Sequence, residues 1–149
     1  MFQKPHCSKQ AYTAAIESGA AVITANAPRR YVTHARKVGW DALTELDTQR
    51  RQLVAYPDTP IEGPYRDRFF SFMGVDTSNG DVDSGVVDSF FRAQQVWDAT
   101  MARSSIEALG THGPPIILLI GRFHSDWNGG TVSQIRRRAP SARVLTISL

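Results

Sequence analysis

The sequence is poor in cysteine and has no long hydrophobic run. Its single cysteine, Cys7, excludes an internal disulfide and a zinc site built from several cysteines. No segment approaches the ~18 consecutive apolar residues that a membrane-spanning helix needs. The first residues also lack the apolar stretch of a secretory signal. We therefore expect a cytoplasmic protein with no membrane segment.

Short motifs of several enzyme classes are absent as well. The sequence contains no Gly-x-Ser-x-Gly, no His-Glu-x-x-His, no P-loop and no Rossmann glycine pattern. The acidic segment 76–88 lacks the glycine and the glutamate that a calcium-binding loop requires, and we interpret it as a polar loop. The net charge is only +3, and the arginines stand in small groups that are typical of solvated helix faces. We therefore expect no nucleic-acid partner.

The periodicity of apolar residues predicts a protein rich in helices. We expect helices over residues 9–18, 29–38, 65–73 and 86–109, another that begins near Trp40, and one that begins near Thr131. Asn26 is a suitable N-cap for the helix over 29–38, and residues 131–134 match a capping box. Gln94 and Asp98 lie four residues apart in the helix over 86–109, so they share one face.

Three short apolar runs, at residues 20–25, 116–120 and 143–149, predict strands. The five consecutive aliphatic residues 116–120 are typical of a parallel strand that is buried on both faces. We therefore expect an α/β fold, a helix-rich three-layer structure with a small, mainly parallel sheet, in which Val22, Ile117 and Leu145 are central. Three strands are few for such a sheet, which indicates an incomplete domain. Residues 1–8 are expected to be disordered or extended.

Candidate binding residues follow two of these predicted strands. Gly121 ends the run at 116–120, and His124 comes three residues later, where parallel sheets bind their ligands. Asn26 and Arg29 follow the first strand at a helix N-terminus, whose free amides favour an anion. We expect Asn26, Arg29 and His124 to lie together and to bind a small anionic ligand. The alternatives are a loop histidine that packs beside Trp127 or faces solvent, and an Asn26 that only caps the helix beside a solvated Arg29. For Asp98 the alternative is a structural hydrogen bond to a backbone loop or a nearby arginine.

Three segments of the chain, in order, resemble a known family. They are residues 25–32 (Ala-Asn-Ala-Pro-Arg-Arg-Tyr-Val), residues 93–102 (Ala-Gln-Gln-Val-Trp-Asp-Ala-Thr-Met-Ala), and residues 120–140, with Gly-Arg-Phe-His near their start. Their order and spacing resemble the C-terminal half of the ChaN-like domain of the Tiki superfamily. ChaN-like bacterial proteins are associated with haem binding and iron uptake, and related Tiki proteins are metal-dependent proteases. Family members can be exported or anchored to a membrane.

The resemblance implies that residues 1–149 form a single ChaN-like domain without its N-terminal half. The family's opening Gly-Glu-x-His motif and the glutamate of its next strand have no counterpart here. The partner that would cover the exposed strand edge is then the missing half or a second copy in a homodimer.

The resemblance also implies a function and a set of site residues. His124 is the implied metal ligand, and haem or a divalent metal is the implied cofactor. The binding residues predicted from the pattern and the resemblance together are Asn26, Arg29, Gln94, Asp98, Gly121 and His124. The implied function is haem or iron binding in iron uptake. A Tiki-like metal-dependent hydrolase and an inactive truncated domain are the alternatives, so the sequence leaves open whether the chain is an enzyme.

Overall fold

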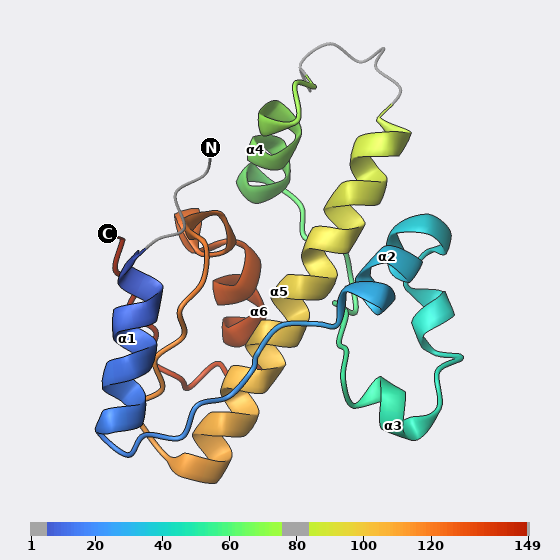
Figure 1. Cartoon of the computed structure of the whole chain (residues 1–149). Coiled ribbons are helices and arrows are strands. Elements are labelled where there is room, and N and C mark those ends of the chain that lie inside the picture. The colour runs from blue at the N-terminus through green and yellow to red at the C-terminus, as the bar shows by residue number, and fades with distance from the viewer. Residues whose placement is uncertain (1–5, 76–83, 149) are drawn as a thin grey trace.

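The computed structural model describes residues 6–75 and 84–148, and every regular element within these ranges is a helix (Figure 1). Three short 3₁₀ helices, named η, accompany the α-helices. The elements are α1 (His6–Glu17), α2 (Arg29–Val38), η1 (Asp41–Leu43), α3 (Thr48–Arg51), α4 (Pro64–Phe72), α5 (Gly85–His112), η2 (Arg122–His124), η3 (Asp126–Asn128) and α6 (Gly130–Arg138). Most of the segment 76–88, interpreted above as a polar loop, lies outside the described residues.

The long helix α5 is the axis of the molecule, and α2, α4 and α6 pack against it (Figure 1). Its buried positions include Val87, Phe91, Gln94 and Asp98, at spacings of four, three and four. Because an α-helix has 3.6 residues per turn, these spacings keep the four residues on one face. Polar residues on that face are therefore carried into the interior.

Two apolar clusters divide the core along α5. The first joins α2 and the loops around η1 to the middle of α5, and it consists of Ala27, Tyr31, Val32, Ala35, Leu43, Val54, Ala93 and Val96. The second joins α4 to the N-terminal half of α5, and it consists of Ile61, Tyr65, Phe69, Phe70, Val87 and Phe91. The polar residues considered below lie next to the second cluster, which contributes Tyr65.

The predicted α/β fold is wrong for the described residues, which contain no strand and no sheet. The segments 20–25, 116–120 and 143–148 are not helical, and no backbone hydrogen bond pairs any one of them with another. The bond of 3.0 Å from Ala20 N to Ala15 O belongs to the turn that ends α1. Val22, Ile117 and Leu145, predicted to be central in strands, are 49, 82 and 83% exposed. Aliphatic runs predict an extended backbone, whereas a sheet also needs neighbours that supply hydrogen bonds. Here those neighbours are absent from the described residues.

The predicted helices are largely confirmed, but two predicted caps are wrong. The helices over 29–38, 65–73 and 86–109 correspond to α2, α4 and α5, whereas the helix expected from Trp40 is replaced by η1 and α3. Pro28 occupies the N-cap position of α2, and Asn26 lies outside it. Gly129 caps α6 without a side-chain hydrogen bond, so residues 131–134 form no capping box. α1 begins at His6, which makes residues 6–8 helical rather than extended.

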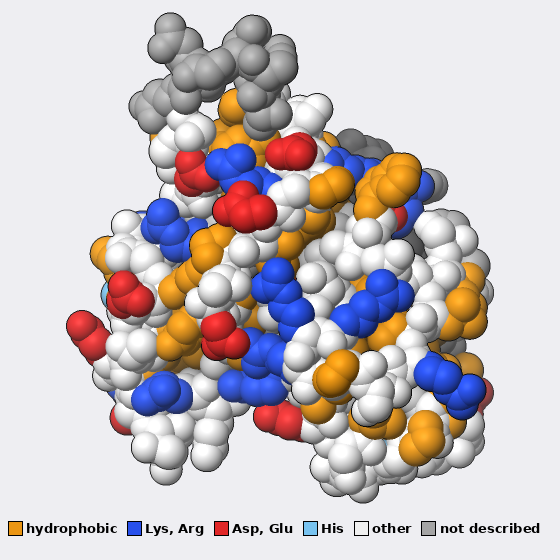
Figure 2. Space-filling model, turned by 180° about the vertical axis from the view of Figure 1, so that it is seen from behind, with side chains coloured by type: hydrophobic (Ala, Val, Ile, Leu, Met, Phe, Trp, Pro, Cys, Tyr) orange, Lys and Arg blue, Asp and Glu red, His pale blue; other side chains and the backbone are white. Residues whose placement is uncertain are grey.

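Apolar side chains remain on the surface of this helical structure. Seen from behind, they form separate patches between basic side chains (Figure 2). The exposed apolar side chains of segments 20–25, 116–120 and 143–148 include Val22, Ile117, Leu119, Leu145 and Ile147. In the part of the chain that the structure describes, no helix is long and apolar enough to cross a membrane.

Candidate functional site

Five polar side chains from four elements meet beside α5 in one hydrogen-bonded network. α4 supplies Tyr65, α5 supplies Gln94 and Asp98, η2 supplies His124, and α6 supplies Thr131. The structure thus brings together Gln94, Asp98 and His124, three of the residues predicted from the sequence. Tyr65 and Thr131 are additions that the sequence analysis missed.

The carboxylate of Asp98 is the centre of this network and is fully buried. Its Oδ2 accepts a hydrogen bond from Tyr65 Oη at 2.6 Å, and its Oδ1 accepts one from Thr131 Oγ1 at 2.9 Å. His124 Nδ1 lies 2.8 Å from the same Oδ1. A buried carboxylate is costly unless it is hydrogen-bonded, and three donors meet that requirement. Asp98 is thus paired, as a buried carboxylate must be, but its partners are the side chains of Tyr65, Thr131 and His124 and not the backbone loop or arginine considered above.

The contacts of His124 determine which ring nitrogen carries the proton. Nδ1 lies between Asp98 Oδ1 at 2.8 Å and Gln94 Nε2 at 3.1 Å, and it can serve only one of them. The carboxylate is the closer and the charged partner, so Nδ1–H donates to Asp98. Gln94 Nε2 donates instead to Tyr65 Oη, 3.1 Å away. In the neutral ring, Nε2 of His124 is then the nitrogen with the free lone pair, and the side chain is 21% exposed.

Tyr65 serves as a permanent donor to Asp98. Burial raises the pKa of its phenol well above the ordinary value, and the negative charge of Asp98 and the hydrogen bond to it raise the pKa further. The hydrogen bond that Tyr65 accepts from Gln94 acts in the opposite direction and is the smallest contribution. The phenol therefore stays protonated at neutral pH and keeps its hydrogen bond to the carboxylate.

The glycine pair at the start of α6, Gly129 and Gly130, allows these groups to approach one another. A Cβ on Gly130 would lie 2.5 Å from the carbonyl oxygen of His124 and 3.0 Å from both Asp98 Oδ1 and Tyr65 Oη. Gly130 also has a φ of +47°, which side chains disfavour. A Cβ on Gly129 would lie 2.9 Å from the ring of Tyr65. Glycine at both positions is thus required by the packing of the network.

At Gly121, by contrast, the structure does not require a glycine, although the sequence suggests a tight glycine turn there. Its φ of −62° is open to any residue, and a Cβ there would lie 3.8 Å from His124 Cδ2, an ordinary contact. Its carbonyl accepts a hydrogen bond from His124 N at 2.9 Å, which closes the η2 turn. The turn therefore depends on the backbone of Gly121 and not on its missing side chain. The signal for the close approach lies instead in Gly129 and Gly130.

Aromatic residues lie near His124 in the chain, and one of them, Phe123, packs on Tyr65 of the network. The ring of Phe123 lies 5.8 Å from those of Tyr65 and Phe72, and Phe72 is 76% exposed. Trp127 is 77% exposed and has a φ of 56°, an uncommon conformation for a bulky residue. Most of Trp127 therefore lies in solvent, and its packing beside His124, the alternative considered for this histidine, stays a prediction.

Two arginines share one carboxylate on the same segment. Asp126 Oδ2 lies 2.8 Å from an Arg68 nitrogen and 3.4 Å from Arg122 Nε. Two guanidinium groups against one carboxylate leave an excess of positive charge here, and the Arg122 side chain is 68% exposed. The surface next to His124 is therefore apolar in part and basic in part.

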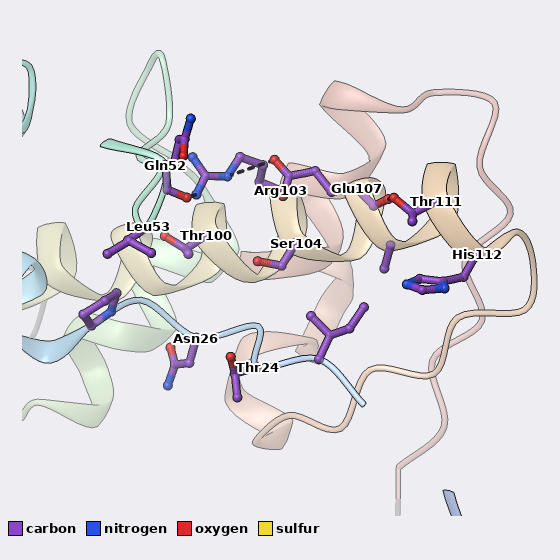
Figure 3. Close-up of a pocket in the computed structure, with 13 residues that line it drawn as sticks. Thr24, Asn26, Gln52, Leu53, Thr100, Arg103, Ser104, Glu107, Thr111 and His112 are labelled. Carbon is purple, nitrogen blue, oxygen red and sulfur yellow. Dashed lines mark hydrogen bonds and ion pairs between the residues drawn. The ribbon is translucent and has the colours of Figure 1, made fainter. Parts of the chain in front are cut away.

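Asn26 and Arg29 lie elsewhere in the structure. Asn26 lines a hollow of about 390 Å³ between the segment 23–28 and the C-terminal half of α5 (Figure 3). Arg29 is the exposed first residue of α2. Among the described residues, no hydrogen bond or ion pair joins either of them to His124. Their predicted grouping relied on the ends of parallel strands, which are absent from the described residues, so a binding role for either stays a prediction.

The hollow that Asn26 lines contains an arginine that is already engaged. Arg103 donates from its terminal nitrogens to the carbonyls of Gln52 and Val54, at 2.6 and 3.1 Å. Its Nε lies 3.5 Å from a carboxylate oxygen of Glu107 (Figure 3). The guanidinium thus links the chain just after α3 to α5, and its charge is paired with Glu107.

Comparison with known proteins places the chain in a family. Residues 9–135 match the family described as "Haem-binding uptake, Tiki superfamily, ChaN". The chain belongs to this family. No curated protein and no solved structure matches the chain significantly. The resemblance found in the sequence is confirmed, and the match spans every residue of the network around Asp98.

The residues around His124 fit the haem that the ChaN family implies. Neutral imidazole is a common axial ligand of haem iron, and His124 has a ring nitrogen with a free lone pair at a partly exposed position. Aromatic side chains suit a porphyrin face, and arginine suits its propionates. Among the described residues, no three His, Cys, Asp or Glu side chains gather as a metal-binding group. Among the described residues of this network, His124 is the side chain that would hold the haem iron.

Proposed function

We propose that this ChaN-family protein binds haem for iron uptake, and that Nε2 of His124 would hold the iron. The observation that supports this most is the hydrogen bond of 2.8 Å between His124 Nδ1 and the buried carboxylate of Asp98. A partner of this kind fixes the tautomer and the orientation of a histidine ligand. It leaves Nε2 to bind iron, on a side chain that is 21% exposed.

The side chains beside His124 complete the proposed binding surface. Phe72 and Trp127 offer exposed apolar area for the porphyrin ring. Arg122, which is exposed and shares Asp126 with Arg68, can meet a propionate. Bound haem would supply an iron centre as cargo. The residues of the chain orient the imidazole and hold its Nδ1 proton.

The experiment is a titration of the purified protein with hemin, followed by the Soret absorption. We expect saturable binding with a shifted Soret band, and a loss of at least about tenfold in affinity in His124→Ala because the iron loses its ligand. His34→Ala is the matched control, since His34 is exposed on α2 and lies outside the network. Equal affinity of the wild type and His124→Ala would refute the proposed ligand.

Metal-dependent hydrolysis, the alternative function that the resemblance implied, has less support. A hydrolytic metal needs several protein ligands and an open position for water. The described residues provide one histidine here, and its partner Asp98 is turned toward Nδ1, with both oxygens engaged. No specific feature of the described residues favours hydrolysis over haem binding.

A further inference from the structure

The hydrogen bonds around Asp98 oppose one another in their effect on His124. Asp98 Oδ1 attracts the Nδ1 proton of His124 across 2.8 Å, which increases the electron density of the imidazole. Tyr65 and Thr131 donate to the same carboxylate, at 2.6 and 2.9 Å. Each donor withdraws electron density from the carboxylate and so weakens its attraction for the Nδ1 proton.

We infer that Asp98 is a positioning residue that makes His124 a strongly electron-donating ligand, and that Tyr65 and Thr131 limit this effect. The polarisation of His124 follows from the geometry alone, whereas its consequence for a bound haem rests on the proposed function. An electron-rich axial imidazole stabilises ferric over ferrous iron and lowers the reduction potential of the haem. The buried carboxylate and its two hydroxyl donors together set that potential.

The inference predicts effects of opposite sign for residues in one network. Asp98→Asn removes the charge, so we expect a higher haem reduction potential and about 10- to 100-fold weaker hemin binding. Tyr65→Phe and Thr131→Val each remove one donor, which frees the carboxylate to attract the Nδ1 proton more strongly. For both we expect a lower reduction potential than in the wild type. A purely structural role would give no such opposition of sign.

A readout without haem tests the polarisation itself. In ¹⁵N-labelled protein, the Nδ1–H proton of His124 resonates further downfield as its hydrogen bond to the carboxylate strengthens. We expect this resonance to move upfield in Asp98→Asn and further downfield in Tyr65→Phe and Thr131→Val. Tyr31→Phe is the matched control. It removes another buried phenol, one that accepts a hydrogen bond from Arg30 on α2, and it should leave the resonance in place.

The two readouts separate the inference from the proposed function. Opposite shifts of the Nδ1–H resonance in a protein that binds no hemin would support the inference and refute the function. Hemin binding through His124 with equal or same-direction shifts in Asp98→Asn and Tyr65→Phe would refute the inference alone. If Asp98→Asn fails to fold, a downfield shift in Tyr65→Phe and Thr131→Val supports the inference, and an unchanged resonance refutes it.

Discussion

At the scale of single residues, sequence patterns predict some residues of the candidate site and miss others. His124 could be chosen as a candidate ligand because it follows a glycine at the end of an aliphatic run. Asp98 could be placed on a helix face with Gln94, but helical spacing does not tell which loop that face meets. The sequence predicts that Thr131 begins a capping box, but its hydroxyl donates to Asp98 Oδ1. A buried charge attracts donors from distant elements, and sequence spacing does not record this.

Gly130 gives a direct test of the close packing in the network. We expect Gly130→Ala to lower the free energy of unfolding by about 1–3 kcal/mol, because of its positive φ and the approach of the new Cβ to His124 O. Gly110→Ala is the control. Gly110 lies in α5 with open space around it, and the added methyl group should stabilise the helix by up to about 1 kcal/mol. Urea denaturation measures both, and equal effects of the two variants would contradict the packing argument.

Tyr65 predicts a specific dependence of stability on pH. Its pKa is raised on folding above the ordinary value of 10.0, so the unfolded chain loses the phenol proton first as the pH rises. The stabilisation is fully present below about pH 10, and above it Tyr65 should lower the free energy of unfolding by up to about 1.4 kcal/mol per pH unit. Urea denaturation between pH 9 and about 11 should show a steeper decline in the wild type than in Tyr65→Phe. Parallel declines would contradict the raised pKa.

At the scale of elements, the helices could be predicted and the sheet could not. The bounds of α2 match the expected 29–38, and those of α4 and α5 fall within a few residues of the expected ranges. These helices satisfy their own backbone, and their periodic apolar residues report burial on one face. The runs at 116–120 and 143–149 are also apolar. A strand, however, needs backbone hydrogen bonds from neighbouring strands, which its own sequence does not reveal. That a second copy or a further segment covers the exposed side chains of 116–120 and 143–148 stays a prediction.

One pair of truncations distinguishes the observed structure from the expected sheet. Val96 on α5 is fully buried, so Val96→Ala should cost about 2 kcal/mol of unfolding free energy. Ile117 is 82% exposed, so Ile117→Ala should change the free energy of unfolding by no more than about 0.5 kcal/mol. A cost for Ile117→Ala as large as that for Val96→Ala would show that the segment 116–120 is buried after all.

At the scale of the whole molecule, the candidate site lies where α4, α5, η2 and α6 meet. The residues involved span positions 65 to 131, so no short motif contains the site. α5 carries two of them from the core, and the other elements bring the rest to the same buried carboxylate. The family match covers all five residues of the network. Nε2 of His124, which the network of described residues leaves without a hydrogen bond, is a suitable ligand for the haem that the family implies.

The most direct test of the central claim is the resonance Raman spectrum of the ferrous haem complex. If Nε2 of His124 binds the iron, the iron–histidine stretching band should shift to lower frequency when the histidines are labelled with ¹⁵N. The band should persist in His34→Ala and vanish in His124→Ala. An isotope-sensitive band that survives unchanged in His124→Ala, or a complex whose spectrum shows no such band, would contradict the account.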